Sequence, residues 1–222
     1  ATSVPELVVV IAAAVSGAFA ARFWNIASSN IINFFLFASA VAVYRQHMSL
    51  LNRIFIDEAV FGILSIGIPV IMHIKKIAPG WPVALILLGF FTVYKITDRL
   101  LSKTASAAPE DGYSSGNTGK GILLLSVGII TVIIAGRFLG TSAEILINAL
   151  NTPPWLVGWL LGFITSIPEM ASFFEIYRIE KKMGRSHLLH GTQEALDTLI
   201  ASNMSNLGII LPVGILICLL FG

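Results

Sequence analysis

Long apolar stretches alternate with short polar segments along the whole chain. Because about 20 apolar residues span the hydrocarbon core of a bilayer, these stretches predict membrane helices. Charged residues or Gly/Pro turns separate them, and the first helix is predicted to end at Arg22-Phe23-Trp24. The pattern predicts an all-α polytopic membrane protein with about seven transmembrane helices, at roughly 1–21, 26–44, 59–75, 80–97, 120–149, 153–179 and 194–221.

The composition supports the same class of protein. Hydrophobic residues make up 56% of the 222-residue chain and charged residues 12%, whereas about 25% are charged in a typical soluble domain. The mean hydropathy is +0.86. A soluble enzyme is therefore nearly excluded, and we expect neither enzymatic activity nor a cofactor. The single cysteine, Cys218, excludes a disulfide framework within the chain, and no basic face indicates nucleic acid as a partner.

The basic residues are unevenly divided between the two sides of the predicted membrane. Of the 14 Lys and Arg residues, ten fall on one side and three, Arg22, Lys75 and Lys76, on the other. Cytoplasmic loops carry an excess of Lys and Arg. We therefore expect an integral protein of the cell membrane, with the lipid bilayer as a partner and with the linker at 98–119 and the loop at 180–193 in the cytoplasm.

The two ends of the chain predict that it is part of a larger membrane protein. The chain begins at Ala1-Thr2-Ser3, without the Met and the charged segment that open a signal peptide. This start reads as the middle of a helix, and the last apolar run stops directly at Gly222. We expect the missing helices of the parent protein to be further partners of this chain.

Two short polar motifs occur twice, in the same order. Thr2-Ser3-Val4-Pro5-Glu6 reappears as Thr165-Ser166-Ile167-Pro168-Glu169, and Ala27–Asn33 reappears as Ile200–Asn206, with S-N-x-x-N in both copies. The copies start on the first and sixth predicted helices. Because these helices are five apart, the two copies cross the membrane in opposite directions. Inverted repeats with polar motifs at the middle of the membrane are typical of secondary transporters.

The motif residues suit a hard cation. Thr and Ser precede each Glu by one helical turn and share its face, and each Pro disturbs the helix and frees a backbone carbonyl. Carboxylate, hydroxyl and amide oxygens are the donors that Ca²⁺ takes. A lone Ser, Thr or Pro in a membrane helix usually serves packing. The buried Glu6 and Glu169 are different, because ionisable groups inside a membrane are costly and usually functional.

These motifs resemble the α-repeats of the calcium/cation antiporter superfamily, the membrane domain of the sodium/calcium exchanger. That family carries G-[ST]-S-x-P-E on one helix and G-S-N-x-x-[ND] on the next, twice. The resemblance implies an inverted-repeat antiporter fold of ten helices, of which about seven are present here. It divides the chain into a first half at 1–97 with one repeat at 1–44, the linker at 98–119, and a second half at 120–222 with the other repeat at 153–221.

The resemblance also implies a set of cation ligands. Gly162 matches a position that contributes a backbone carbonyl, and Ser28 and Ala201 replace glycines of the motif. Asn206 stands where many sodium/calcium exchangers have Asp, so the site has two acids and the transport stoichiometry is not transferable. The implied ligands are Glu6, Glu169, Thr2, Ser3, Ser29, Asn33, Gly162, Thr165, Ser166, Ser202 and Asn206.

We therefore expect a secondary antiporter that exchanges Ca²⁺ for Na⁺ by alternating access. A Ca²⁺/H⁺ antiporter of the same fold is the main alternative, because burial favours the protonated form of a Glu. A cation channel is less favoured, since no motif forms a multi-subunit filter, and an inactive fragment is the remaining alternative. Elsewhere, Arg137, with Glu144 two turns later on the same face, is interpreted as an ion pair or a snorkelling Arg rather than as a residue that couples the helix to gating. His187 and His190 are not expected to bind a metal.

Overall fold

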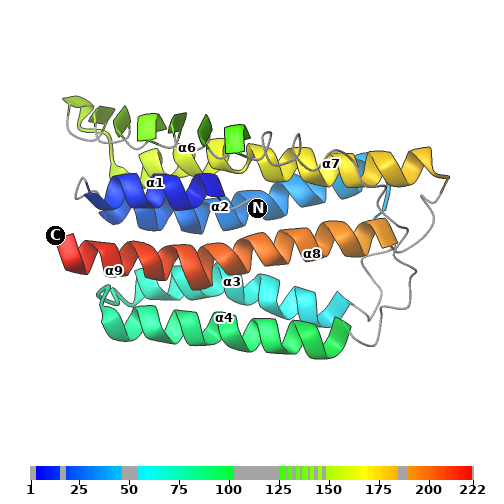
Figure 1. Ribbon diagram of the computed structural model, residues 1–222, viewed down its shortest axis with the longest axis horizontal. Helices are drawn as coiled ribbons and strands as arrows, with labels where there is room; N and C mark the ends of the chain where they lie inside the picture. The colour runs from blue at the N-terminus through cyan, green and yellow to red at the C-terminus, as the bar shows by residue number, and fades with distance from the viewer. Residues whose placement is uncertain are drawn as a thin grey trace.

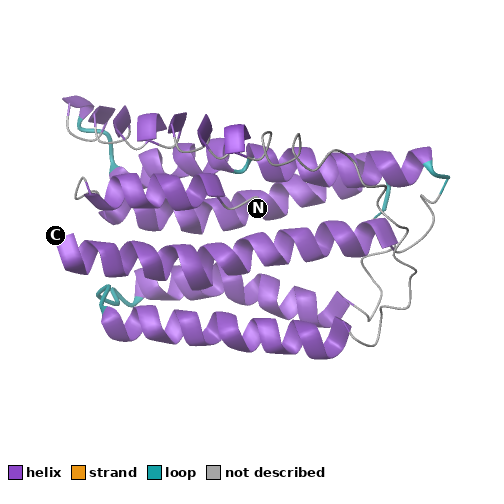
Figure 2. Cartoon of the chain, in the orientation of Figure 1, coloured by secondary structure: helices purple, strands orange, loops and turns teal. Residues whose placement is uncertain are grey.

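In the computed structural model, the described part of the chain consists of helices joined by short turns, without strands (Figures 1 and 2). This part comprises residues 4–15, 19–46, 55–102, several positions between 126 and 150, 151–184 and 190–221. Its elements are α1 (Val4–Val15), α2 (Phe19–Val43), α3 (Ile56–Ile74), α4 (Trp81–Ser102), α6 (Pro154–Thr165), α7 (Ile167–Lys182), α8 (His190–Ser205), the π-helix η3 (Asn206–Ile210) and α9 (Leu211–Phe221).

The helices lie roughly side by side in an elongated bundle (Figure 1). α2, α3 and α4 run along most of its length, whereas α1 begins midway and occupies one half. α6 continues into α7 and α8 continues through η3 into α9, so that each pair forms one long rod. Four of the described helical stretches are long and apolar enough to cross a membrane: Phe23–Val43, Ile56–Ile74, Pro154–Lys182 and His190–Leu220. The protein is therefore an all-α polytopic membrane protein.

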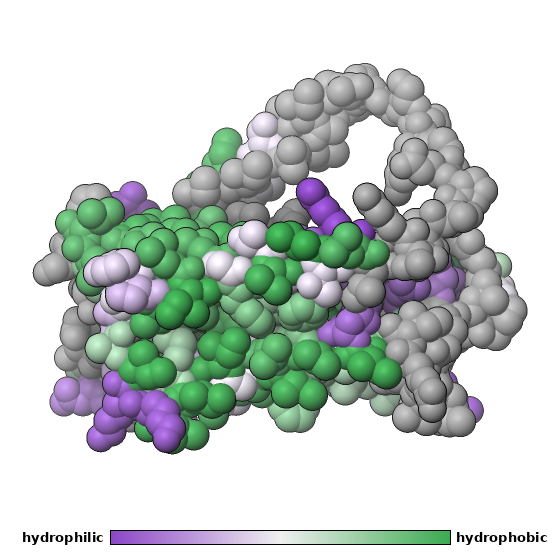
Figure 3. All heavy atoms as spheres, turned by 90° about the horizontal axis from the view of Figure 1, so that it is seen from below, coloured by the Kyte–Doolittle hydropathy of each residue, from purple (hydrophilic) through white to green (hydrophobic). Residues whose placement is uncertain are grey.

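Apolar side chains cover the outside of the bundle. Figure 3 shows one face, on which hydrophobic residues dominate the middle and hydrophilic residues gather toward the ends. Phe35, Ile63 and Ile86 are each about 70% exposed, at 69%, 70% and 70%. Large exposed patches of this kind are unfavourable in water, and at the depth of a bilayer they contact lipid tails instead.

The predicted end of the first helix is wrong. Arg22-Phe23-Trp24 lies within α2, which begins at Phe19, whereas α1 spans Val4–Val15. Arg, Phe and Trp do not end helices by their backbone preferences; an Arg near a span marks the membrane interface instead. Two other helices begin earlier than the predicted spans. α8 begins at His190 rather than at 194. α3 includes Asp57 and Glu58 in its first turn, where acidic side chains favour a helix start.

The basic residues separate between the two ends of the bundle, as the sequence predicts. α2, α4 and α7 end where α8 begins (Figure 1). The described basic residues at or near that end are Arg45, Lys95, Arg99, Arg178, Lys181 and Lys182, whereas Lys75 and Lys76 follow α3 at the opposite end.

The long rod formed by α6 and α7 is interrupted at Ser166. Pro168 occupies the first turn of α7, where its missing N–H group is tolerated. The Ser166 backbone N–H donates to the Gly162 carbonyl at 3.1 Å, and the Ser166 carbonyl accepts from the Met170 N–H at 3.1 Å. The rod therefore continues across the break. The repeated motif Thr165–Glu169 lies at this interruption, as the position of its proline predicts.

The second rod contains one turn of π-helix, η3, which begins at Asn206. A π-turn widens the helix locally and is frequent at functional sites. The motif asparagine of the second repeat therefore lies where the backbone geometry changes. The corresponding Asn33 lies in the uninterrupted α2, so the two repeats differ locally at this position.

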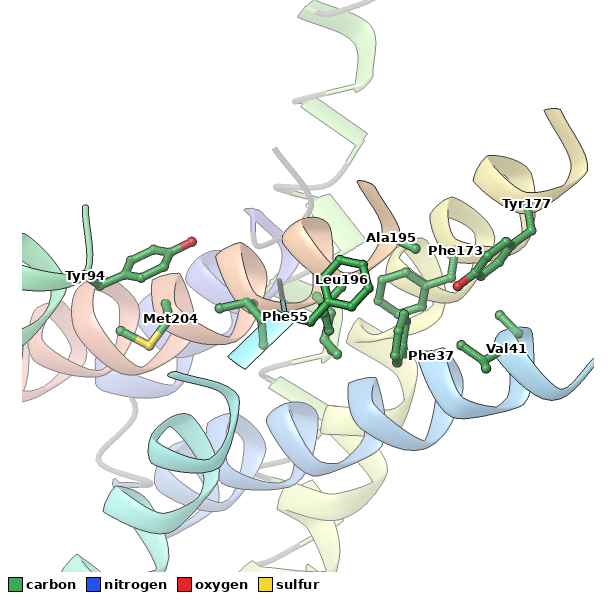
Figure 4. Packing of buried hydrophobic residues seen from close by; sticks show 12 residues of the cluster. Phe37, Val41, Phe55, Tyr94, Phe173, Tyr177, Ala195, Leu196 and Met204 are labelled. Carbon is green, nitrogen blue, oxygen red and sulfur yellow. The ribbon is translucent and has the colours of Figure 1, made fainter. Parts of the chain in front are cut away.

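Two apolar clusters flank the middle of the bundle. One joins α2, α7 and α8, where the Phe37 and Phe173 rings meet edge-on at 5.8 Å (Figure 4). The other joins α1, α2, α3, α4, η3 and α9 and includes Ile26 and Leu207. Along α2, the polar motif at 28–33 falls between Ile26 and Phe37. The polar motif residues are therefore enclosed by apolar packing on both sides.

Candidate ion-binding site

A layer of polar side chains is buried between the two apolar clusters. The helices α1, α2, α3, α6, α7 and α8 and the π-turn η3 all contribute to it. Because buried polar groups are costly unless hydrogen-bonded, so many of them in one layer indicate a functional site. Its members, none more than 3% exposed, are Glu6, Ser28, Ser29, Asn30, Asn33, Ser65, Thr165, Ser166, Glu169, Ser202, Asn203 and Asn206.

Each repeat forms a hydrogen bond between its own Glu and Ser. Ser29 Oγ donates to Glu6 Oε1 at 3.1 Å, and Ser202 Oγ donates to Glu169 Oε1 at 2.9 Å. Ser29 and Ser202 occupy the same place in the repeated motif, as do Glu6 and Glu169. The two repeats therefore build the same contact from a T-S-x-P-E helix and the S-N-x-x-N helix that follows it.

The Glu–Ser pair of the first repeat contacts the T-S-x-P-E motif of the second repeat. The hydroxyl groups of Ser29 and Ser166 share a hydrogen bond of 3.0 Å, which links α2 to the break between α6 and α7. Ser166 directly precedes α7 and lies three residues before Glu169. The motif residues of both repeats therefore form a single site rather than two separate ones.

The four motif asparagines form a reciprocal network beside the carboxylates. Asn33 Nδ2 donates to Asn203 Oδ1 and Asn206 Nδ2 donates to Asn30 Oδ1, both at 3.0 Å. Asn203 Nδ2 donates to the Asn30 carbonyl at 3.0 Å, and Asn30 Nδ2 donates to the Asn203 carbonyl at 3.2 Å. Every bond has a counterpart in the other repeat, so the network holds α2 against the rod of α8 and η3 in a symmetric way.

Asn30 and Asn203 were missed among the candidate residues chosen from the sequence. Their signal was present, because each is the first Asn of an S-N-x-x-N motif. Asn25 was missed as well. It is fully buried on α2, and neither of its amide atoms has a hydrogen-bond partner among the described residues. No motif of the sequence marks it.

Several buried oxygens of the site keep unused hydrogen-bonding capacity. Glu6 Oε2, Asn33 Oδ1 and Asn206 Oδ1 have no hydrogen-bond partner in the described part of the chain. Buried acceptors left in this state are rare and require an explanation. Oxygen atoms of this kind are available to a cation that enters the site.

The amide of Asn206 has a specific role in the network. Its Nδ2 donates to Asn30 Oδ1, and an ionised Asp at this position has no hydrogen to donate. Asp would instead place a carboxylate oxygen against the side-chain oxygen Oδ1 of Asn30. The asparagine that stands where many exchangers have Asp is therefore matched to its neighbour, and the site holds the two buried carboxylates Glu6 and Glu169.

Gly162 lies at a close approach of α6 to α2. A Cβ atom at this position would lie against Ser28 Oγ, 2.9 Å from the Ser29 backbone nitrogen and 3.0 Å from the Asn25 carbonyl oxygen. Ser28, which replaces a motif glycine, donates a hydrogen bond from its hydroxyl group to the Gly158 carbonyl at 3.1 Å. The close approach of the two helices brings Ser29 within reach of Ser166. The Gly162 carbonyl, a predicted ion ligand, accepts from Thr165 Oγ1 at 3.3 Å.

Not every predicted residue can be placed. Thr2, Ser3, Glu144 and His187 lie outside the described residues. Arg137 is exposed. Of the eleven predicted ligands, all except Thr2 and Ser3 are brought into the buried polar layer or, for Gly162, against its edge.

The fold and the site together define a polytopic membrane protein with carboxylates buried at mid-bundle, as in secondary transporters. The sequence matches the family described as sodium/calcium exchanger protein over residues 1–97 and 120–220, and the chain belongs to that family. Neither the curated proteins nor the solved structures contain a significant match.

Substitution of Gly162 tests the close approach of α2 and α6. We expect Gly162→Ala to lower the free energy of unfolding by about 1–3 kcal/mol, because the methyl group meets the backbone of α2. Gly67→Ala on α3 is the matched control, since a Cβ there meets nothing within 4 Å. Thermal unfolding of the purified full-length protein in detergent measures both. Equal stability of the two variants would contradict this close packing of α2 against α6.

Proposed function

We propose that this chain forms the ion-translocating core of an antiporter that exchanges Ca²⁺ for Na⁺ across a membrane by alternating access. The observation that carries the proposal is the single buried layer to which both repeats contribute, in which Ser29 donates to Glu6 and shares a hydrogen bond with Ser166, three residues before Glu169. A site made jointly by two inverted halves is suited to alternating access, because rocking of one half against the other exposes it to either side.

The donor set favours hard cations. Ca²⁺ takes six to eight oxygen ligands, and the site offers carboxylate, hydroxyl and amide oxygens without a His or Cys among the predicted ligands. Two ionised carboxylates carry a charge that one Ca²⁺ or two Na⁺ neutralise. The same residues can therefore bind either ion in turn. These ligands would be Glu6, Glu169, Ser29, Asn33, Thr165, Ser166, Ser202 and Asn206, together with Thr2, Ser3 and the carbonyl of Gly162.

Repulsion between two ionised carboxylates in one buried layer would account for obligatory exchange. Like charges at close range interact far more strongly in the protein interior than in water, so an empty, doubly ionised site is costly to enclose. Binding of Ca²⁺ or Na⁺ removes this cost. The site would therefore change sides only when loaded, and the apolar clusters around Phe173 and Leu207 would keep it closed to one side at a time.

The placement in the membrane follows from the basic residues. The end of the bundle rich in Lys and Arg would face the cytoplasm, together with the linker at 98–119 and the loop at 180–193. The cell membrane is the proposed location. The remaining helices of the family's ten-helix arrangement would come from the parent protein and complete the enclosure of the site.

Proton coupling is the second candidate, and Asn206 is the observation that favours it. Without a third acid, the site can release one Ca²⁺ by taking two protons on Glu6 and Glu169. Burial favours the protonated form of a carboxylic acid. A Ca²⁺/H⁺ antiporter would use the same ligands and the same conformational cycle.

Radioactive Ca²⁺ uptake into proteoliposomes separates the candidates. The full-length parent protein is reconstituted, and ⁴⁵Ca²⁺ uptake is measured first with an outward Na⁺ gradient and then with an outward H⁺ gradient. We expect uptake driven by the Na⁺ gradient alone. Uptake driven only by H⁺ would support the proton-coupled alternative, whereas uptake that does not saturate and needs no counter-ion would indicate a channel.

Substitution of either glutamate tests the predicted ligands in the same assay. Glu6→Gln and Glu169→Gln are each expected to reduce uptake to background, because each removes half of the charge that balances Ca²⁺. Ser205→Ala should stay within about twofold of the wild type, since it lies off the Ser202/Asn206 face and such substitutions usually change stability by less than about 0.5 kcal/mol. Glu175→Gln, an exposed carboxylate on α7, is the matched control. Equal losses in all four variants would count against the ligand assignment.

A further inference from the structure

A second cluster of ligand-bearing side chains lies at the basic end of the bundle, outside the ion-binding layer. Glu180 from the last turns of α7 meets His190 and Glu194 from the start of α8. One ligand atom from each residue lies within 4.8 Å of the others. His190 Nδ1 and Glu180 Oε1 are 3.3 Å apart. The cluster shares no residue with the proposed exchange site.

We propose that Glu180, His190 and Glu194 form a binding site for a divalent transition-metal ion of the Zn²⁺ class. His190 and Glu194 are four positions apart, so they project from the same face of α8. Glu180 supplies the third ligand from the neighbouring helix. Three protein ligands with a fourth position open to water are a common arrangement for Zn²⁺.

The donor types favour this class of ion, and the one short separation between ligand atoms fits it. With metal–ligand bonds of about 2.0–2.1 Å in a tetrahedral arrangement, neighbouring ligand atoms lie roughly 3.3 Å apart, which matches the separation of His190 Nδ1 and Glu180 Oε1. One imidazole nitrogen and two carboxylate oxygens suit Zn²⁺ or Co²⁺. Ca²⁺ takes oxygen ligands, so the imidazole selects against the proposed transported ion.

Two features of the local structure keep Glu180 in place. Glu180 is buried, with 5% of its surface exposed. A Cβ atom at Gly191 would lie 2.6 Å from Glu180 Cγ, so the absence of a side chain there leaves the room that Glu180 occupies against α8.

The C-terminal end of α7, where Glu180 lies, also attracts cations through the helix dipole. His190 and Glu194 are exposed, so an ion can reach the cluster from solution.

The sequence alone does not reveal this site. The spacing of His187 and His190 did not predict a metal site. The three proposed ligands come from two different helices, with Glu180 on α7 and His190 and Glu194 on α8. An ion bound here would tie the end of α7 to the start of α8. These helices carry Glu169 and Ser202 respectively, so the metal would hold together the two helices that form the Glu–Ser pair of the second repeat.

Metal titration of the purified full-length protein, without a polyhistidine tag, tests the proposal. Zn²⁺ affinity is measured by competition with a chromophoric chelator, and Co²⁺ is added separately to follow its visible absorption. We expect the wild type to bind Zn²⁺. His190→Gln and Glu194→Gln should each weaken binding at least about tenfold and abolish the Co²⁺ absorption of the site. Both residues are exposed, so neither substitution should prevent folding.

The controls separate this site from the exchange site. His73→Gln removes a histidine near the end of α3, at the other end of the bundle, and Glu175→Gln removes an exposed glutamate of α7. Both should bind Zn²⁺ like the wild type, as should Glu6→Gln, whatever its effect on exchange. Absence of Zn²⁺ binding, or unchanged binding in His190→Gln and Glu194→Gln, would leave only an ion pair between Glu180 and His190. Binding lost in Glu6→Gln alone would place the ion in the exchange site and overturn the proposal.

Discussion

Glu6 and Glu169 are fully buried in the middle of an apolar bundle, and an ionised carboxylate in such a place costs several kcal/mol unless other groups stabilise it. The surrounding structure supplies part of that stabilisation. Each carboxylate accepts a hydrogen bond from the serine of its own repeat, at 3.1 Å and 2.9 Å. What these hydroxyls do not provide is positive charge, because the described polar layer contains neither Lys nor Arg. The missing charge is what a transported cation would bring.

The helix packing follows from the need to bring these groups together. The two S-N-x-x-N helices are held by reciprocal amide bonds among Asn30, Asn33, Asn203 and Asn206, and α2 approaches α6 closely because Gly162 has no side chain. Interhelical hydrogen bonds and small residues are the usual means of helix association in membranes, where the hydrophobic effect does not operate between helices. In this protein, the contacts that stabilise the bundle are therefore the same contacts that place the candidate ligands.

Much of this arrangement could be predicted from the repeated motifs. The proline of T-S-x-P-E predicted a helix disturbance, which lies at Ser166, and the doubled motifs predicted that Glu, Ser and Asn would meet. The start of α2 at Phe19 could not be predicted, because hydropathy locates the edge of the membrane rather than the end of a helix. The partners of Asn30 and Asn203, and the meeting of Glu180 with His190, depend on which helices become neighbours. Local sequence pattern does not contain that information.

Equilibrium Ca²⁺ binding tests most directly whether the two repeats build one shared site. The number of Ca²⁺ ions bound per chain is measured for the purified full-length protein and for the Glu6→Gln and Glu169→Gln variants, at a Ca²⁺ concentration that saturates the wild type. If both carboxylates hold the same ion, either substitution alone removes the bound Ca²⁺ completely. If each variant instead retains half of the Ca²⁺ bound by the wild type, the repeats carry independent sites and a single shared site is contradicted.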